Sequence, residues 1–162
     1  MIHGLSLVHV LLALGAVACI YLVVRELRRT YVSQWRLFAP GLAGLFVAGG
    51  LFLMQIVAGQ PRWTFAVAAL IGLVIGVARG LTIGLSHDLY HPQIIISHVA
   101  KLTLLGVSLG IGLCVALEII GAFSSPGLEK LRLWAALSAM VCAVAMLGRA
   151  LVLTIRLRRE PP

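Results

Sequence analysis

The stretch GLVIGVARGLTIG, from Gly72 to Gly84, places a glycine at every fourth position of an apolar run. Residues four apart lie on one face of a helix, so Gly72, Gly76, Gly80 and Gly84 form a bare backbone edge. Lipid tails gain nothing from such an edge, but a second helix can approach it closely. The stretch therefore predicts a helix that packs tightly against another helix inside a membrane.

The composition of the whole chain also indicates a membrane setting. Hydrophobic residues make up 61% of the 162 residues, charged residues make up 11%, and the mean hydropathy is +1.08. A soluble domain has roughly a quarter of its residues charged, so this chain has too few charges to cover a surface in water. We predict an integral membrane protein and attribute its net charge of +8 to membrane orientation rather than to nucleic-acid binding.

Five apolar segments each approach the ~20 residues that a helix needs to cross a bilayer. Helices are required because lipid offers no partner to unpaired backbone groups. We therefore predict an all-α bundle of five transmembrane helices that forms one domain over residues 1–162. The expected spans are about 4–24, 37–57, 64–85, 102–123 and 133–155. Neither Lys nor Arg precedes the first span, so we interpret it as a retained helix rather than a signal peptide.

Basic residues in the loops orient the predicted bundle. The loop from Arg25 to Arg36 contains four arginines, and the tail from Arg156 to Arg159 adds three. With five crossings, both lie on the same side of the membrane. The opposite side has Arg62, Lys130 and Arg132. Because the side richer in basic residues is usually cytoplasmic, the N-terminus is predicted outside and the C-terminus in the cytoplasm.

The fourth segment has a second edge of small residues. Gly106 and Gly110 continue at four-residue spacing into Cys114 and Glu118. Consecutive membrane helices are antiparallel neighbours, so we expect the third and fourth helices to pack on each other through their glycine edges. The alternative is that one of these edges docks a neighbouring subunit.

Three charged residues lie inside the apolar segments, where an ionised side chain is costly. Arg79 and Arg149 fall toward the inner ends of their helices. They either form a cationic pocket for an anionic lipid headgroup, quinone oxygens or a partner's carboxylate, or extend separately to the headgroups as anchors. Glu118 lies nearer the outer end of its helix. We expect it to pair with Arg132 or Lys130, or to remain protonated.

The histidines provide two further candidate sites. His9 lies well inside a segment and is a candidate ligand of a pigment or a hydrogen-bond partner of a quinone, whereas a bis-histidine haem needs a second histidine at the same depth. In SHDLYHPQIIISH, His87, Asp88 and His91 are weak candidate ligands of a divalent metal. Pro92 interrupts any helix that would align them, so we favour a polar loop without metal. The three isoleucines there predict a short strand or an interfacial segment.

The chain contains no GxSxG, HExxH or P-loop motif and no span with paired carboxylates. We therefore predict a non-enzymatic accessory, assembly or structural subunit that binds lipid, a cofactor or a partner membrane protein. The sequence requires no cofactor, and bound lipid and other subunits or copies are the expected partners. Two alternatives remain open: a redox-associated or pigment-associated subunit that uses His9, and a small oligomeric transporter or channel that uses Glu118.

Several short stretches occur in a recognisable order. RELRR follows the first apolar segment, WRLFAPGL opens the second, IGLVIGVARG lies in the third, and a polar segment with Asp88 precedes the fourth. In this order they resemble the CcdC-like family of small bacterial membrane proteins. The resemblance implies a bacterial inner-membrane protein linked to cytochrome c biogenesis, and it assigns no functional residue. The three histidines of the inner segment depart from that pattern.

Overall fold

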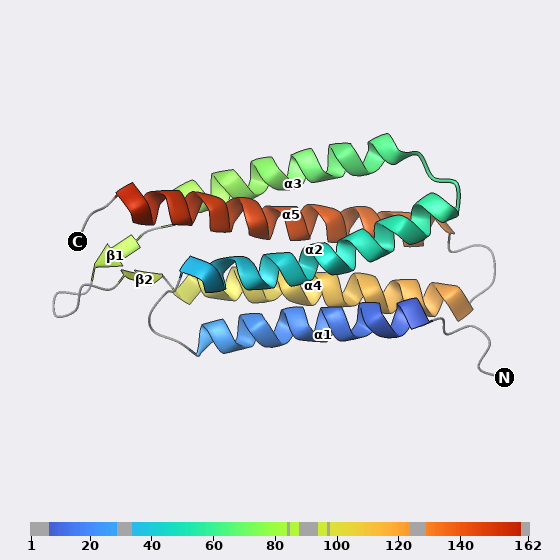
Figure 1. The fold of residues 1–162 in the computed structure, drawn as a ribbon, viewed down its shortest axis with the longest axis horizontal. Coiled ribbons are helices and arrows are strands. Elements are labelled where there is room, and N and C mark those ends of the chain that lie inside the picture. The colour runs from blue at the N-terminus through green and yellow to red at the C-terminus, as the bar shows by residue number, and fades with distance from the viewer. Residues whose placement is uncertain are drawn as a thin grey trace.

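The computed structural model of this chain contains five long helices and a small β-hairpin (Figure 1). It describes residues 7–28, 34–83, 85–87, 94–96, 98–123 and 129–159. The elements are α1 (Leu7–Leu27), α2 (Gln34–Val57), α3 (Arg62–Thr82), β1 (Leu85–His87), β2 (Ile94–Ile96), α4 (His98–Phe123) and α5 (Glu129–Arg159). All five helices are long and apolar enough to span a membrane, so the predicted helix number and the all-α class are confirmed.

The helix boundaries differ from the predicted spans. α5 is 31 residues long, and α4 begins at His98 rather than near residue 102. α3 ends earlier than predicted, at Thr82, because Ile83 is extended (φ −70°, ψ 120°) and Leu85 enters β1. The run of isoleucines forms β2, which pairs antiparallel with β1, so the predicted short strand is confirmed.

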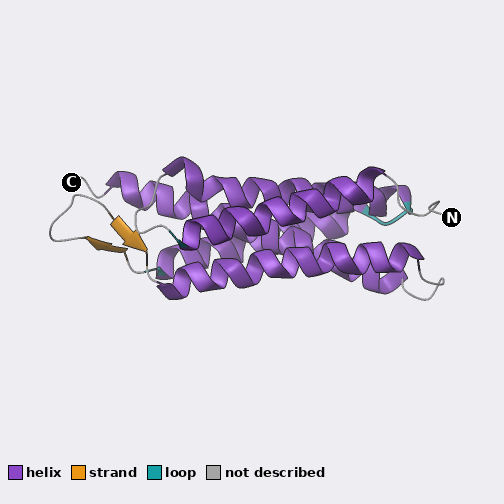
Figure 2. Ribbon diagram, turned by 90° about the horizontal axis from the view of Figure 1, so that it is seen from below, coloured by secondary structure: helices purple, strands orange, loops and turns teal. Residues whose placement is uncertain are grey.

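Successive helices run in opposite directions, which gives the bundle two distinct ends (Figures 1 and 2). The hairpin lies beside the last turns of α3 and α5 and the first turns of α2 and α4 (Figure 1). We call this the hairpin end and the opposite one the far end. The alternation follows the predicted order of five crossings.

α5 is the central helix and lies against α2, α3 and α4, while α1 packs on α2 and α4 (Figure 1). Within its most apolar stretch, α5 has 56% of its residues buried, and no other helix exceeds 33%. Small side chains explain this position, because they let neighbouring helices approach the α5 backbone. The buried alanines of α5 are Ala135, Ala136, Ala139, Ala143 and Ala150.

The glycine edge of α3 lies directly on α5. A methyl group added at Gly72 would come within 2.5 Å of the Val141 carbonyl oxygen. One added at Gly76 would overlap the backbone of Ala145, and one at Gly80 would lie 2.7 Å from a side-chain carbon of α5. A backbone cannot turn away as a side chain can, so this interface requires glycine on α3.

The predicted pairing of the third helix with the fourth is wrong. Among the described residues, α3 packs along α5 and not along α4. A methyl group added at Gly106 or Gly110 would have no neighbouring heavy atom within 4 Å. Four-residue spacing identifies a face that accepts a close neighbour, and the alanine-rich α5 provides that neighbour for α3. Gly84, the last glycine of the stretch, lies outside the described residues.

One arginine of α5 forms hydrogen bonds with the end of α3. Nη1 of Arg156 donates hydrogen bonds to the carbonyl oxygens of Gly80 (3.2 Å), Leu81 (3.2 Å) and Ile83 (2.8 Å). The last carbonyls of a helix have no partner within the helix, and a cation there also opposes the negative end of the helix dipole. Arg156 therefore satisfies the end of α3 and fixes its position on α5.

We expect Gly76→Ala to lower the free energy of unfolding by roughly 1–3 kcal/mol, because the added methyl group overlaps a backbone that cannot give way. Reversible unfolding in mild detergent measures this change. Gly49→Ala is the matched control, since Gly49 has no neighbouring heavy atom within 4 Å of an added methyl group. Equal effects of the two variants would contradict the contact between α3 and α5.

We expect Arg156→Gln to weaken the end of α3 by about 1–2 kcal/mol, because three carbonyls lose a charged donor. Amide hydrogen exchange in the last turn of α3 should accelerate about tenfold, while exchange in α1 stays unchanged. Arg158→Gln alters an exposed arginine of the same α5 turn and should leave the α3 rates as they are. Unaltered exchange in Arg156→Gln would show that this arginine does not cap α3.

Candidate functional site

Three adjoining hollows lie at the hairpin end of the bundle. The first, of about 20 Å³, lies between α1, α2, α4 and α5, and the second, of about 120 Å³, lies between α3, α4 and α5. The third, of about 70 Å³, lies between α1 and α2. Arg149, Leu104 and Met146 line both the first and the second, while Glu26 and Arg36 line both the first and the third. The hollows therefore follow one another across the bundle at a common level.

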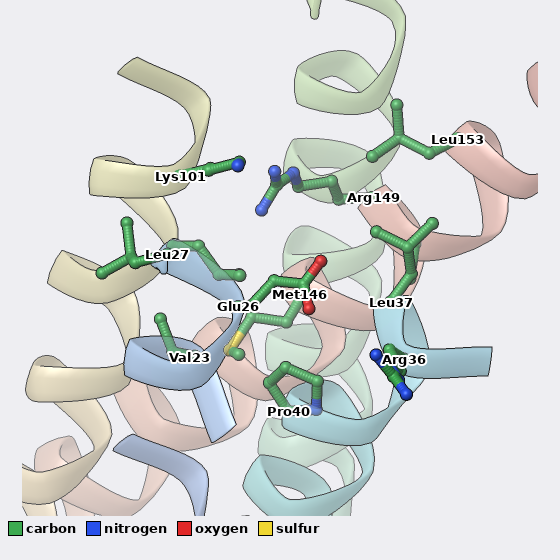
Figure 3. Close-up of a pocket in the computed structure, with 12 residues that line it drawn as sticks. Val23, Glu26, Leu27, Arg36, Leu37, Pro40, Lys101, Met146, Arg149 and Leu153 are labelled. Atoms are coloured by element: carbon green, nitrogen blue, oxygen red, sulfur yellow. The ribbon is translucent and has the colours of Figure 1, made fainter. Parts of the chain in front are cut away.

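Charged side chains gather around these hollows. Arg149 and Lys101 are 9% and 6% exposed, and Figure 3 shows them extending toward each other from α5 and α4. Glu26 and Arg36 line the same hollow (Figure 3), and the exposed Arg79 lines the second hollow with Arg149. We call these five residues the cationic site, which contains four basic side chains and one carboxylate.

The helix ends add to the positive potential of the cationic site. Arg36 lies in the first turn of α2 and Lys101 in the first turn of α4. A helix N-terminus is already the positive end of the helix dipole, where a cation is unfavourable and an anion is favoured. Arg149 differs from the others, because it lies about 15 Å before the end of α5. An anion at this site would meet side-chain charges that come from the first turns of two helices and from the interior of a third.

Arg149 is the least compensated charge of the site. Its Nε is buried and has no hydrogen-bond partner among the described residues. Its guanidinium is attracted by Glu26 and repelled by Arg79. A buried donor left without an acceptor costs about 1–3 kcal/mol, and a guanidinium has donors for several acceptor oxygens. The chemistry that fits this geometry is a group with negative charge and more than one oxygen.

Arg79 and Arg149, predicted to share a pocket, both line the second hollow. Their surroundings differ, because Arg79 is exposed and Arg149 is buried, so only Arg79 can extend freely as a helix anchor. The sequence analysis missed Lys101, Arg36 and Glu26 as members of this site because it placed them in or next to loops. Their position within one turn of a helix end was the signal that could have found them.

A second polar site lies toward the far end. Glu118 of α4 is fully buried, and its Oε1 accepts hydrogen bonds from Nε (3.0 Å) and Nη2 of Arg132 on α5. Arg132 is one of the two partners predicted for it, and the other, Lys130, is exposed. The Arg132 side chain passes over Gly121, where an added methyl group would lie 2.7 Å from its Cδ. The missing side chain of Gly121 makes room for this ion pair.

The remaining candidate residues do not form a site in the described part of the chain. His9 is buried on α1, and the described residues contain no group of three His, Cys, Asp or Glu that can hold a metal ion. His87 lies in β1, whereas Asp88 and His91 lie outside the described residues. The pigment or quinone role of His9 and the metal role of the hairpin segment therefore stay predictions.

Comparisons of this chain with protein families, with curated proteins and with solved structures find no match. The resemblance to the CcdC-like family stays an expectation from the sequence. The functional conclusion therefore rests on the geometry of the cationic site.

We expect Arg132→Met to lower the free energy of unfolding by roughly 3 kcal/mol, because it leaves the buried Glu118 carboxylate without its partner. The double variant Glu118→Leu with Arg132→Met removes both charges and should recover most of this loss. Lys130→Met is the control for the exposed neighbouring cation. A double-mutant cycle with no coupling between the two positions would contradict a stabilising pair.

Proposed function

We propose that this protein is a non-enzymatic accessory or assembly component of a membrane, and that its cationic site binds a phosphate-bearing anion. A membrane setting is supported by the outside of the bundle, where large apolar side chains are exposed on every helix. Examples are Leu14, Phe46, Leu70, Leu113 and Leu151. A surface of this kind marks contact with lipid or with other proteins rather than with water.

We propose that the hairpin end faces the cytoplasm of a bacterial inner membrane. This end combines the cationic site with the basic residues at the end of α1 and the end of α5, while Arg62, Lys130 and Arg132 lie at the far end. Excess basic charge favours the cytoplasmic side. Trp63 and Trp134, both exposed, lie near the starts of α3 and α5, where interfacial aromatic residues are common.

In this orientation the cationic site lies just inside the layer of cytoplasmic headgroups. The lipids of that leaflet are often anionic and attract basic residues. The proposal therefore brings together a positive site and a layer rich in phosphate groups. It also accounts for a charged residue such as Arg149 deep in an apolar helix, because such residues usually face the bundle interior and mark binding sites or pathways.

The observation that carries this proposal is the buried Arg149 guanidinium with its unpartnered Nε. Arg149, Lys101 and Arg79 approach the hollows from three different helices. A tetrahedral phosphate can offer a separate oxygen to each of them, and charge-assisted bonds of arginine to phosphate are among the stronger hydrogen bonds. A planar carboxylate matches three converging cations less well.

A binding role fits the polar groups of the site better than catalysis. They are cations and one carboxylate, together with the Thr103 hydroxyl. That hydroxyl already donates a hydrogen bond to the Ala100 carbonyl oxygen (2.9 Å). Nucleophilic catalysis needs a nucleophile within hydrogen-bond reach of a base, and the described lining of the site offers no such pair.

We expect Arg149→Met to reduce binding of phosphatidylglycerol at least tenfold, because it removes the central donor of the cationic site. Native mass spectrometry in a neutral detergent measures lipid retention during a titration. Arg158→Met removes an exposed arginine from the same helix and should bind as the wild type does.

The same pair of variants separates binding from folding. Replacing a poorly compensated buried charge by an apolar side chain of similar length should leave stability unchanged or raise it. A stable Arg149→Met protein that binds phosphatidylglycerol like the wild type would contradict the proposal. An equal loss of binding in Arg158→Met would also contradict the proposal, because it would show that the basic hairpin end attracts the lipid nonspecifically.

A further inference from the structure

We propose that the phosphate of the cationic site belongs to a phospholipid, and that one acyl chain of this lipid lies in a groove of small residues between α3 and α4. This inference rests on the proposed function and adds the chemical class of the ligand. The groove is defined by Gly106 and Gly110 on α4 and by Ser138, Cys142 and Ala145 on α5.

The second hollow is the start of this groove. Arg79 and Arg149 lie on its charged side, and apolar side chains such as Ile75, Val107 and Ala145 form the rest of its lining. It lies where α3 and α4 both flank α5 without packing along each other. A ligand held here meets cations at one end and hydrocarbon at the other, which is the polarity of a phospholipid.

The α5 face beyond this hollow is unusually open. Ala145, Cys142 and Ser138 lie on one face of α5, at successive steps of three and four residues. Although α5 is the most buried helix, Ser138 is exposed and Cys142 is only half-buried. Gly76 of α3 lies against Ala145 and Cys114 of α4 lies against Ser138, and the half-buried Cys142 lies between these two contacts. We infer that this strip is the floor of a groove bordered by α3 and α4.

Glycines of α4 form one side of the same groove. Gly106 and Gly110 follow Thr103, which lines the second hollow, by three and seven residues and therefore lie on nearly the same face of α4. Neither glycine has a neighbouring heavy atom within 4 Å of an added methyl group. One turn further on, Cys114 lies 3.2 Å (Sγ to Oγ) from Ser138, which shows that this part of α4 borders the α5 floor.

The length and polarity of the groove match an acyl chain. From Arg149 to Ser138 the α5 backbone rises about 16 Å, and one leaflet of a bilayer has a hydrocarbon thickness of about 15 Å. The Ser138 hydroxyl donates a hydrogen bond to the Ala135 carbonyl oxygen (2.9 Å) and leaves no free donor facing the chain. A phosphate at Arg149 would therefore place its acyl chain along the groove toward Ser138.

Charge complementarity favours a lipid over a helix from another protein as the occupant. A transmembrane helix in the groove would cover the small residues but would carry an apolar surface past Arg79 and Arg149. A phospholipid covers the same small residues and also neutralises the two arginines. The exposed Arg79 then contacts the phosphate from the lipid side and Arg149 contacts it from the protein side.

The test compares two probes with the same headgroup: phosphatidylglycerol and glycerophosphoglycerol, which has no acyl chains. The groove variant is Gly106→Leu with Gly110→Leu, which fills the groove without altering a charge. We expect it to bind phosphatidylglycerol about tenfold more weakly, because the acyl chain loses its contact surface. Binding of glycerophosphoglycerol, measured by calorimetry, should not change.

The control variant is Gly49→Leu, which adds the same side chain at an open glycine of α2 and should bind both probes normally. If the groove variant binds phosphatidylglycerol as tightly as the wild type, the chain lies elsewhere and this inference fails while the proposed function stands. If the wild type binds neither probe, the proposed function itself fails. A wild-type dimer that becomes monomeric in the groove variant would assign the groove to a second copy and overturn the inference.

Discussion

The contact between the glycine face of α3 and the backbone of α5 determines how the rest of this bundle is arranged. Since Gly72, Gly76 and Gly80 have no side chains, α3 rests on the α5 backbone at the first two of these turns and on the Val152 side chain at the third. A helix held this closely cannot rotate or slide without creating overlaps. The contact therefore fixes the register of α3 against α5, and with it the level at which every other α3 side chain lies.

That register places two arginines beside each other. A methyl group added at Gly80 would lie 3.3 Å from the Arg149 carbonyl oxygen, and Arg79 precedes Gly80. The same packing that stabilises the bundle thus brings one cation next to another at the hairpin end. Like charges repel, so an anion that interacts with both would relieve a cost that the close packing imposes. Packing and ligand binding are in this way physically coupled.

The close contact of α3 with α5 also leaves α4 with an open face. Because α3 lies against α5, Gly106 and Gly110 of α4 have no close neighbour among the described residues, and Cys142 and Ser138 of α5 stay partly accessible. The result is a groove that begins at the cationic site and runs toward the middle of the bundle. The packing of α3 on α5 rather than on α4 therefore accounts for both the charged and the apolar part of the proposed lipid site.

The sequence predicted those features that depend on local pattern or on one strong interaction. Segment length and hydropathy predicted five helices, and pairing with Arg132 was one of the outcomes predicted for Glu118 from the cost of a buried carboxylate. The partner of α3 was not predictable in this way. Glycine spacing describes one surface only. The matching surface on α5 consists of the backbone of Val141 and Ala145 together with Gly148 and Val152, and these residues share no pattern that stands out in the sequence.

The cationic site was only partly predictable for a similar reason. Arg79 and Arg149 stand out as charges within apolar runs, but Lys101, Arg36 and Glu26 lie at helix ends, where charged residues are usually solvated. α2 and α4 pack on α5 and α1 packs on α2 and α4, and only this convergence brings the three residues to one hollow. Convergence of this kind is a property of tertiary packing and leaves no pattern in one segment.

The central claim is that α3 rests on α5 rather than on α4, and solid-state NMR of the protein in bilayers tests it without any substitution. With glycine and alanine labelled by carbon-13, the account predicts a through-space cross-peak between the Cα atoms of Gly76 and Ala145, which lie on opposing backbones. A cross-peak from Gly76 to Gly106 or Gly110, with none to Ala145, would contradict it.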